Sequence, residues 1–318
     1  MIRSVAHRVR ALARATIGPS ALILTYHRVA DLERDPQLLA VTIANFEAQA
    51  AILASRYQVV PLVDLVDDLR SRRLHDRTVA FTFDDGYADN LENARSTLET
   101  HGLPATVFVS SGCLGGDREF WWDEIERIVL ADDPDTTWNV LEPPRTAPQR
   151  EYLELMAAIH PLPARERDAA LVATRNRYGA AAGVRQTNRP LTAADIAALD
   201  ASLVIEVGAH SADHEVLSGL SELRQRETIL QDKAELERLC SREMRLFSYP
   251  YGQRDDYSAA TVEIVRDAGF QGACANHPGL VKPRTDPFRL PRHVVRNWSA
   301  DELAARIDAW FAGREVGP

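Results

Sequence analysis

Two adjacent carboxylates, Asp84 and Asp85, follow the apolar run Val79–Phe83 and precede Gly86. The run has the composition of a buried strand, and sites in parallel α/β sheets are built at the carboxyl ends of strands. Neighbouring carboxylates repel each other, so the pair is costly unless a cation or a proton is present. The segment therefore indicates either a charged site or an Asp-Gly turn that closes a strand.

Two histidines, His210 and His214, follow a second apolar run, Leu203–Val207. At positions i and i+4 they are expected on one face of a helical turn, which Ser211 is suited to cap. This spacing suits two ligands of one metal ion. A solvated pair of histidines is the alternative interpretation.

The carboxylate pair and the histidine pair both follow strands that should end at the same edge of one sheet. Two histidines and one aspartate form a three-ligand site with an open position for water, as in catalytic zinc sites. The remaining aspartate can then take a proton from that water. The two pairs together favour a hydrolytic metal site over either structural alternative.

A third segment, Phe247-Ser248-Tyr249-Pro250-Tyr251-Gly252, also lies where a strand is predicted to end. Its proline and glycine fix a turn that can present the backbone N–H of Tyr251 outward. A backbone donor at that place can stabilise a tetrahedral oxyanion. Taken alone, the segment is equally well explained as a structural turn.

Apolar, β-branched runs alternate with helical patterns along most of the chain, which predicts a parallel sheet, open or closed into a barrel. Asp89 or Asn90 can cap one of the helices. Strands are predicted at Ala21–Thr25, Gln58–Pro61, Val79–Phe83, Ala105–Val109, Leu203–Val207, Arg245–Tyr249, Gln271–Ala275 and His293–Arg296. Helices are predicted at Asn45–Arg56, Val63–Arg72, Asn90–Thr100, Ser221–Ser241, Tyr257–Ala268 and Ala300–Phe311.

The alternation stops between residues 112 and 201, where the pattern is helical at Trp121–Ala131 and Gln149–His160. We therefore expect one domain over 21–318 that carries a helical insertion at 112–201. The full length of 318 residues fits one α/β barrel with such an addition.

Composition narrows the class of protein further. The net charge of −9 argues against generic nucleic-acid binding, which needs a basic face. The three cysteines, Cys113, Cys240 and Cys274, are far apart and are predicted to be reduced thiols. No run approaches the roughly 20 apolar residues that a membrane-spanning helix needs.

Residues 1–20 form a basic segment whose apolar positions fall at helical spacing, and they lack the apolar core of a signal peptide. One interpretation is an amphipathic helix that rests on an anionic membrane surface through residues 1–18. The other is a surface helix packed on the domain, or a frayed end. We expect a cytoplasmic protein. The alternative is a cytoplasmic protein that is peripherally bound to the inner membrane surface.

The three motifs, in this order, resemble the polysaccharide deacetylases with a NodB homology domain (carbohydrate esterase family 4), over roughly Ala21 to Arg296. The resemblance implies a distorted seven-stranded (β/α) barrel that hydrolyses N-acetyl groups of amino-sugar polymers. It implies Asp84 as general base and a divalent metal, with Zn²⁺ as first choice, on Asp85, His210 and His214. It also implies that the Tyr251 N–H lies in the oxyanion hole.

The chain departs from the family pattern at the residue that orients the catalytic aspartate. The family usually has an arginine where this chain has Ser248. Arg292, from the last predicted strand, is the candidate replacement.

The second departure concerns the general acid, which in the family is usually the histidine of a Leu-x-His motif. Here the match, Leu290-Pro291-Arg292-His293, is one residue longer, and one extra residue turns a strand side chain to the other face. His293 is the candidate acid. His27, after the first strand, competes for that role or lines the substrate groove, and His277 is a third option.

The expected activity is release of acetate from an N-acetylated glycan or glycan precursor, with no role for nucleic acid. The alternatives are metal-dependent hydrolysis of another non-peptide amide and an inactive glycan-binding module. Trp121 and Trp122 either stack on sugar rings or bury themselves in the core.

Overall fold

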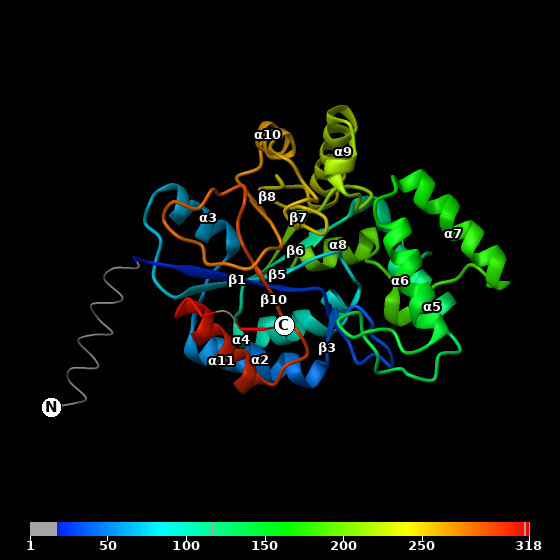
Figure 1. The fold of residues 1–318 in the computed structure, drawn as a ribbon. Coiled ribbons are helices and arrows are strands. Elements are labelled where there is room, and N and C mark those ends of the chain that lie inside the picture. Colours follow the sequence, from blue (N-terminus) through cyan, green and yellow to red (C-terminus); the bar gives the residue numbers. More distant parts are fainter. Residues whose placement is uncertain (1–17, 116, 315, 318) are drawn as a thin grey trace.

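The computed structural model describes residues 18–115, 117–314 and 316–317, so the basic segment predicted at 1–20 lies almost wholly outside it. Seven parallel strands form the main sheet in the order β10-β1-β5-β6-β7-β8-β9 (Figure 1). They are β1 (Ala21–Tyr26), β5 (Thr78–Phe83), β6 (Ala105–Val109), β7 (Ile205–Ala209), β8 (Leu246–Ser248), β9 (Gly272–Cys274) and β10 (His293–Val294). An eighth, β4 (Gln58–Val59), pairs with the start of β5, and β2 (Arg28–Val29) pairs with β3 (Ala40–Val41) in a small separate sheet.

The two ends of the main sheet meet through the segment that leads into β10. Leu290 accepts a hydrogen bond from Ala275 N–H at 2.9 Å and donates its own N–H to Ala273 at 3.0 Å. Three residues later the same segment pairs with β1. The sheet therefore curls into a distorted seven-stranded barrel, and the fold class predicted from the sequence is confirmed.

The strands are apolar on both faces because both faces are covered. Every residue of β1, β5 and β6 is buried. Alternate residues of β1 enter different clusters: Leu22 and Leu24 pack with outer helices, whereas Ala21 and Ile23 pack with α3. The helices around the barrel are α2 (Ile43–Arg56), α3 (Leu62–Arg70), α4 (Arg95–His101), α8 (Ala193–Asp200), α9 (Glu222–Cys240), α10 (Ala259–Asp267) and α11 (Ala300–Phe311).

Three further helices lie together at one side of the sheet, away from α2, α4 and α11 (Figure 1). They are α5 (Trp121–Val129), α6 (Ala147–Ile159) and α7 (Ala164–Tyr178). Their buried side chains form a separate hydrophobic cluster with Tyr87, which follows the carboxylate pair. The predicted helices at 121–131 and 149–160 are present, whereas α7 was not predicted. The division of the chain at 112 and 201 stays a prediction.

Two local predictions need correction. The strand expected at Leu203–Val207 begins at Ile205, since Leu203 is fully exposed. The helix expected at Asn90–Thr100 starts as a π-helical turn, Asn90–Ala94, and Asp89 does not cap it. The Asp89 carboxylate is engaged elsewhere: it accepts hydrogen bonds from Arg28 Nε and Val29 N–H, both at 3.0 Å.

Short 3₁₀ turns complete the secondary structure at Ser111–Cys113, Gln186–Asn188 and Leu217–Gly219. No helix among the described residues combines the length and the apolar character that crossing a bilayer requires.

Gly208 on β7 gives a test of the packing that positions the histidine motif. A Cβ at this position would lie 2.6 Å from two ring atoms of the fully buried Phe108. We expect Gly208→Ala to lower the free energy of unfolding by about 1–3 kcal/mol, because the core has no space for the methyl group. Gly219→Ala is the control, since nothing lies within 4 Å of that site. Denaturant unfolding measures both, and equal stability of the two variants would contradict the packing described.

Candidate active site

The carboxylates of Asp84 and Asp85 lie at the carboxyl end of β5, each less than 5% exposed. Asp84 continues the strand, with its N–H donated to Tyr26 at 3.0 Å. Asp85 and Gly86 then both adopt left-handed backbone, with φ of 75° and 86°. Because the chain reverses at Asp85, the two side chains separate, and Asp85 is available to a different set of partners from Asp84.

His210 and His214 lie on a loop after β7 and not on the helical turn that their spacing predicts. Asp232 of α9 accepts the His210 N–H at 2.7 Å, and Thr228 accepts the Ala212 N–H at 3.1 Å. Ser211 and His214 adopt left-handed backbone, with φ of 62° and 50°, which a right-handed helical turn does not contain. The loop nevertheless brings the two imidazole rings to 4.9 Å between centroids.

The donor atoms of Asp85, His210 and His214 form the only cluster among the described residues with the composition and compactness of a metal site. Asp85 Oδ1 lies 3.5 Å from His210 Nε2 and 3.1 Å from His214 Nε2. Tetrahedral ligands bonded at about 2.0–2.1 Å are separated by about 3.3–3.4 Å, so the trio fits a divalent ion such as zinc. His210 Nδ1 lies 2.7 Å from the Ser248 carbonyl, a contact that leaves Nε2 free to ligate.

The protonation states of Asp85 and His214 also suit a metal, whereas Asp84 and Asp85 outweigh burial and raise the pKa of His210. Burial raises the pKa of Asp85, but hydrogen bonds with His210 and His214 hold that pKa well below its usual range. Burial lowers the pKa of His214 to about 4 despite the neighbouring Asp85. The site thus offers an ionised carboxylate and a neutral imidazole, which are the forms that bind metal.

Arg292 holds Asp84 through two parallel hydrogen bonds, Nη1 to Oδ1 at 2.7 Å and Nη2 to Oδ2 at 2.6 Å. Arg292 is 1% exposed, and its Nε donates to the Ala275 carbonyl at 2.8 Å. Burial raises the pKa of Asp84, but Arg292 outweighs it and brings that pKa below its ordinary value. Asp84 is therefore an ionised carboxylate of fixed orientation.

His293 points away from the site. Successive residues of an extended chain face opposite sides, so with Arg292 turned toward Asp84 its neighbour faces outward. His293 Nε2 accepts the Gly279 N–H at 3.2 Å, and its ring stacks on Trp310 at 4.0 Å. The expectation that His293 supplies the general acid is thus corrected, because the structure places it outside the cavity. His277 is also outside it.

His27 lies in the cavity with Asp84 and Asp85. Hydrogen bonds hold this segment in place. The His27 carbonyl accepts Asn90 Nδ2–H at 2.9 Å, and the Asp89 carboxylate accepts hydrogen bonds from the two residues that follow. Among the described residues its buried Nδ1 has no hydrogen-bond partner. Burial lowers the pKa of His27, and Asp85 and Asp84 oppose that effect.

Tyr251 adopts left-handed backbone, with φ of 57°, and Gly252 follows with φ of 71°. The backbone of Asn276 packs so closely that a Cβ on Gly252 would lie 2.8 Å from its nitrogen. Within the described part of the chain no acceptor pairs with the Tyr251 N–H. The Tyr251 ring lies 4.5 Å from that of His214, so this turn borders the metal trio as predicted.

A cavity of about 140 Å³ lies over these groups. Trp121 and Trp122 border it but are 5% and 3% exposed, with their N–H groups donated to Tyr251 Oη and Tyr87 Oη. They belong to the core, and they offer no exposed platform for a sugar. The full lining is His27, Gln37, Leu39, Asp84, Asp85, Trp121, Trp122, Met156, His160, His210, His214 and Tyr251.

Met156 of α6 and His160, the residue that caps its C-terminus, line the cavity without having been predicted from the sequence. The His160 ring lies 4.2 Å from that of Tyr251. No sequence motif identifies these two residues, because only the packing of α6 against the barrel brings them to the strand ends. Their i and i+4 spacing on a predicted helix is the one signal that was present.

Comparison with known proteins agrees with this geometry. The family model described as polysaccharide deacetylase matches residues 71–133 and 187–273, which include both motif pairs. Over these residues the chain carries the sequence signature of the polysaccharide deacetylase family. The resemblance inferred from the motifs is confirmed, and with it the assignment to the hydrolases of this family. A comparison with curated proteins finds no match.

Solved structures of similar fold include the following three. IcaB from Ammonifex degensii has a TM-score of 0.63 and 20% identity, over 92% of this chain and 98% of that chain. Streptococcus pyogenes deacetylase PplD, in complex with acetate, has a TM-score of 0.61 and 14% identity, over 91% and 99%. A polysaccharide deacetylase from Bacillus cereus has a TM-score of 0.58 and 16% identity, over 91% and 69%.

Ser248 explains how the chain accommodates its altered motif. Its Oγ accepts a hydrogen bond from Arg292 Nη2 at 2.9 Å and donates to Asp84 Oδ2 at 3.3 Å. The small side chain leaves the interior space that the guanidinium of Arg292 fills. The contact expected between Arg292 and Asp84 is therefore present, although the arginine comes from a different strand.

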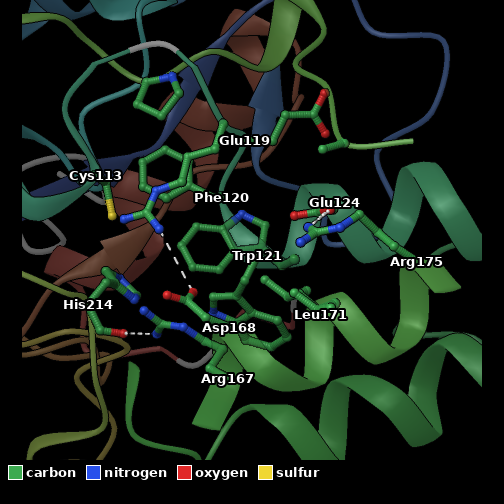
Figure 2. Close-up of a pocket in the computed structure, with 15 residues that line it drawn as sticks. Cys113, Glu119, Phe120, Trp121, Glu124, Arg167, Asp168, Leu171, Arg175 and His214 are labelled. Atoms are coloured by element: carbon green, nitrogen blue, oxygen red, sulfur yellow. Dashed lines mark hydrogen bonds and ion pairs between the residues drawn. The ribbon is translucent and has the colours of Figure 1, made fainter. Parts of the chain in front are cut away.

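Arg167 connects α7 to the loop that carries His214 (Figure 2). Its Nη1 donates to the His214 carbonyl at 3.1 Å and its Nη2 to the Asp213 carbonyl at 2.6 Å. Arg167 is 8% exposed, and no carboxylate forms an ion pair with it within the described ranges. Since His214 is held at φ of 50°, these bonds stabilise a backbone conformation that an unsupported histidine would leave.

The contact predicts that Arg167 contributes to metal affinity. Arg167→Met should raise the Kd for Zn²⁺ about 10–100-fold, because groups that orient ligands typically contribute that much. Competition titration with a chelator, in the absence of substrate, measures the Kd. Arg165→Met, at an exposed position of the same helix, is the control and should leave it unchanged. Equal affinities of the two variants would contradict the assigned role.

Proposed function

We propose that this protein hydrolyses the N-acetyl groups of amino-sugar residues in a glycan and releases acetate, with a divalent metal bound by Asp85, His210 and His214. The observation that carries the proposal is Asp84. It is a second carboxylate beside the trio, buried, ionised and held by Arg292 in one orientation. A site built only to bind metal or glycan has no need of such a residue.

The reaction follows from where charge develops. The metal would supply Lewis-acid activation of the amide carbonyl and of the attacking water. Asp84 accepts the proton of that water, and Arg292 keeps its carboxylate in line during the transfer. The free N–H of Tyr251 donates to the oxygen on which negative charge accumulates.

His27 supports the last step, protonation of the leaving amine. An amine is too basic to leave as an anion, so an acid must reach its nitrogen. His27 lines the same cavity as Asp84, and its Nδ1 is free. The lowered pKa of His27 makes its protonated form a stronger acid than an exposed histidine. Asp84 and His27 thus divide the roles of base and acid.

The decisive test compares Asp84→Asn with His214→Ala. Asp84→Asn should retain metal and lose acetate release by about 10²–10⁴-fold, because the base is removed and the trio is intact. His214→Ala should lose both. Metal content after dialysis and acetate release from N-acetylated oligosaccharides are the measurements, with chelator-treated protein as control. Full activity in a metal-free Asp84→Asn protein would refute the mechanism.

The same assay separates the remaining alternatives. Turnover of a formamido sugar or a cyclic imide in preference to N-acetylated glycans would favour a hydrolase of another amide. Glycan binding without metal dependence or acetate release would favour a binding module.

A second comparison identifies the acid. His27→Gln should lower kcat by about 10²–10⁴-fold, because glutamine fills the position without donating a proton. His293→Gln should keep kcat within about tenfold of the parent, since His293 faces Trp310 outside the cavity. Thermal unfolding of both variants distinguishes lost stability from lost chemistry. If His293→Gln lowered kcat more than His27→Gln does, the general acid would be His293 of β10 and not His27.

A further inference from the structure

Helix α6 forms the wall of the cavity that lies away from the strand ends. Met156 and His160 are one helical turn apart on one face of it and both line the cavity. Tyr152, one turn before Met156, and Ile159, three residues after it, are buried in the cluster that also contains Trp121. Thr146 caps the helix start, so α6 is held in place along its length.

The lining of the cavity divides by polarity. Its ionisable groups come from the strand ends, apart from His160, whereas its apolar side chains are Leu39, Trp121, Trp122 and Met156. The two tryptophan N–H groups are already bonded to tyrosine hydroxyls, so the rings add apolar surface. An acyl group whose carbonyl meets Tyr251 N–H therefore places its alkyl part against this apolar side.

The size of the cavity limits what fits there. Its volume is about 140 Å³. An apolar cavity of about 150 Å³ in another protein holds one benzene molecule, which sets the scale. An acetamido group is smaller than benzene and fits such a space, and each methylene added to it extends the alkyl end toward the apolar wall that includes Met156. Among the apolar side chains that line the cavity, Met156 is the flexible one. It is only partly buried and packs against the hydrophobic cluster of α5, α6 and α7.

We propose that Met156 sets the acyl length that the protein accepts and restricts it to short N-acyl groups, formyl and acetyl. The inference rests on the proposed function, because it concerns the acyl group that the same site hydrolyses. It assigns a specificity-determining residue to α6, which lies outside the residues that the family model matches.

The test measures kcat/KM for glucosamine oligosaccharides carrying N-formyl, N-acetyl, N-propionyl or N-butyryl groups. Met156→Ala should raise the propionyl-to-acetyl ratio about 10–200-fold, the range that one methylene contributes in an apolar pocket. Met156→Phe should lower the acetyl-to-formyl ratio instead. Leu155→Ala is the matched control: it removes a similar volume from the same helix, but Leu155 borders a different surface hollow and should leave every ratio unchanged.

Each outcome decides the inference. The inference is supported if Met156→Ala favours the longer acyl group, Met156→Phe favours the shorter one, and Leu155→Ala leaves every kcat/KM ratio unchanged. General loosening of the fold would not shift the ratios of the two Met156 variants in opposite directions. Unchanged ratios in both Met156 variants, with acetyl hydrolysis retained, overturn it and leave the proposed function standing. Absence of hydrolysis of every N-acyl substrate by the parent protein overturns the proposed function itself.

Discussion

Arg292 and Asp84 form a bidentate ion pair in the barrel interior, where both side chains are almost completely buried. Removing one partner of a buried pair costs about 3–5 kcal/mol because the other charge stays behind unpaired. The pair therefore constrains the fold as well as the chemistry. It requires that the strand carrying Arg292 close the barrel beside β9, and that the position facing both residues be as small as Ser248.

Closure of the sheet has a second consequence, for the histidine beside that arginine. An extended chain can turn only one of two successive side chains toward the interior. Once Arg292 takes that direction, His293 must pack outside, on Trp310. Among the histidines that the sequence offers as general acids, His27 is the one that lines the cavity, where Asn90 and Asp89 anchor it.

The parts of the site that the sequence predicts are those whose position follows from a strand. Asp84, Asp85 and Tyr251 each stand directly after an apolar run, and strand ends of a parallel sheet meet at one edge. The predictions that failed depend on partners far away in the chain. The histidine motif lacks its helical turn because Ser211 and His214 adopt left-handed backbone, and Asp232 and Thr228 hold this loop through the N–H groups of His210 and Ala212. No periodicity in one segment can disclose such distant partners.

The α5–α7 cluster could not be placed from sequence for the same reason, yet it meets the site from two directions. On one side Arg167 bonds the backbone of the metal-ligand loop. On the other, Met156 faces the space where the acyl group would lie. Both residues project from a hydrophobic cluster separate from that of the barrel, so a change in how the cluster packs would alter ligand geometry and cavity size together. Metal affinity and acyl selectivity are therefore expected to covary among variants of the cluster, whereas variants of the outer barrel helices should change stability alone.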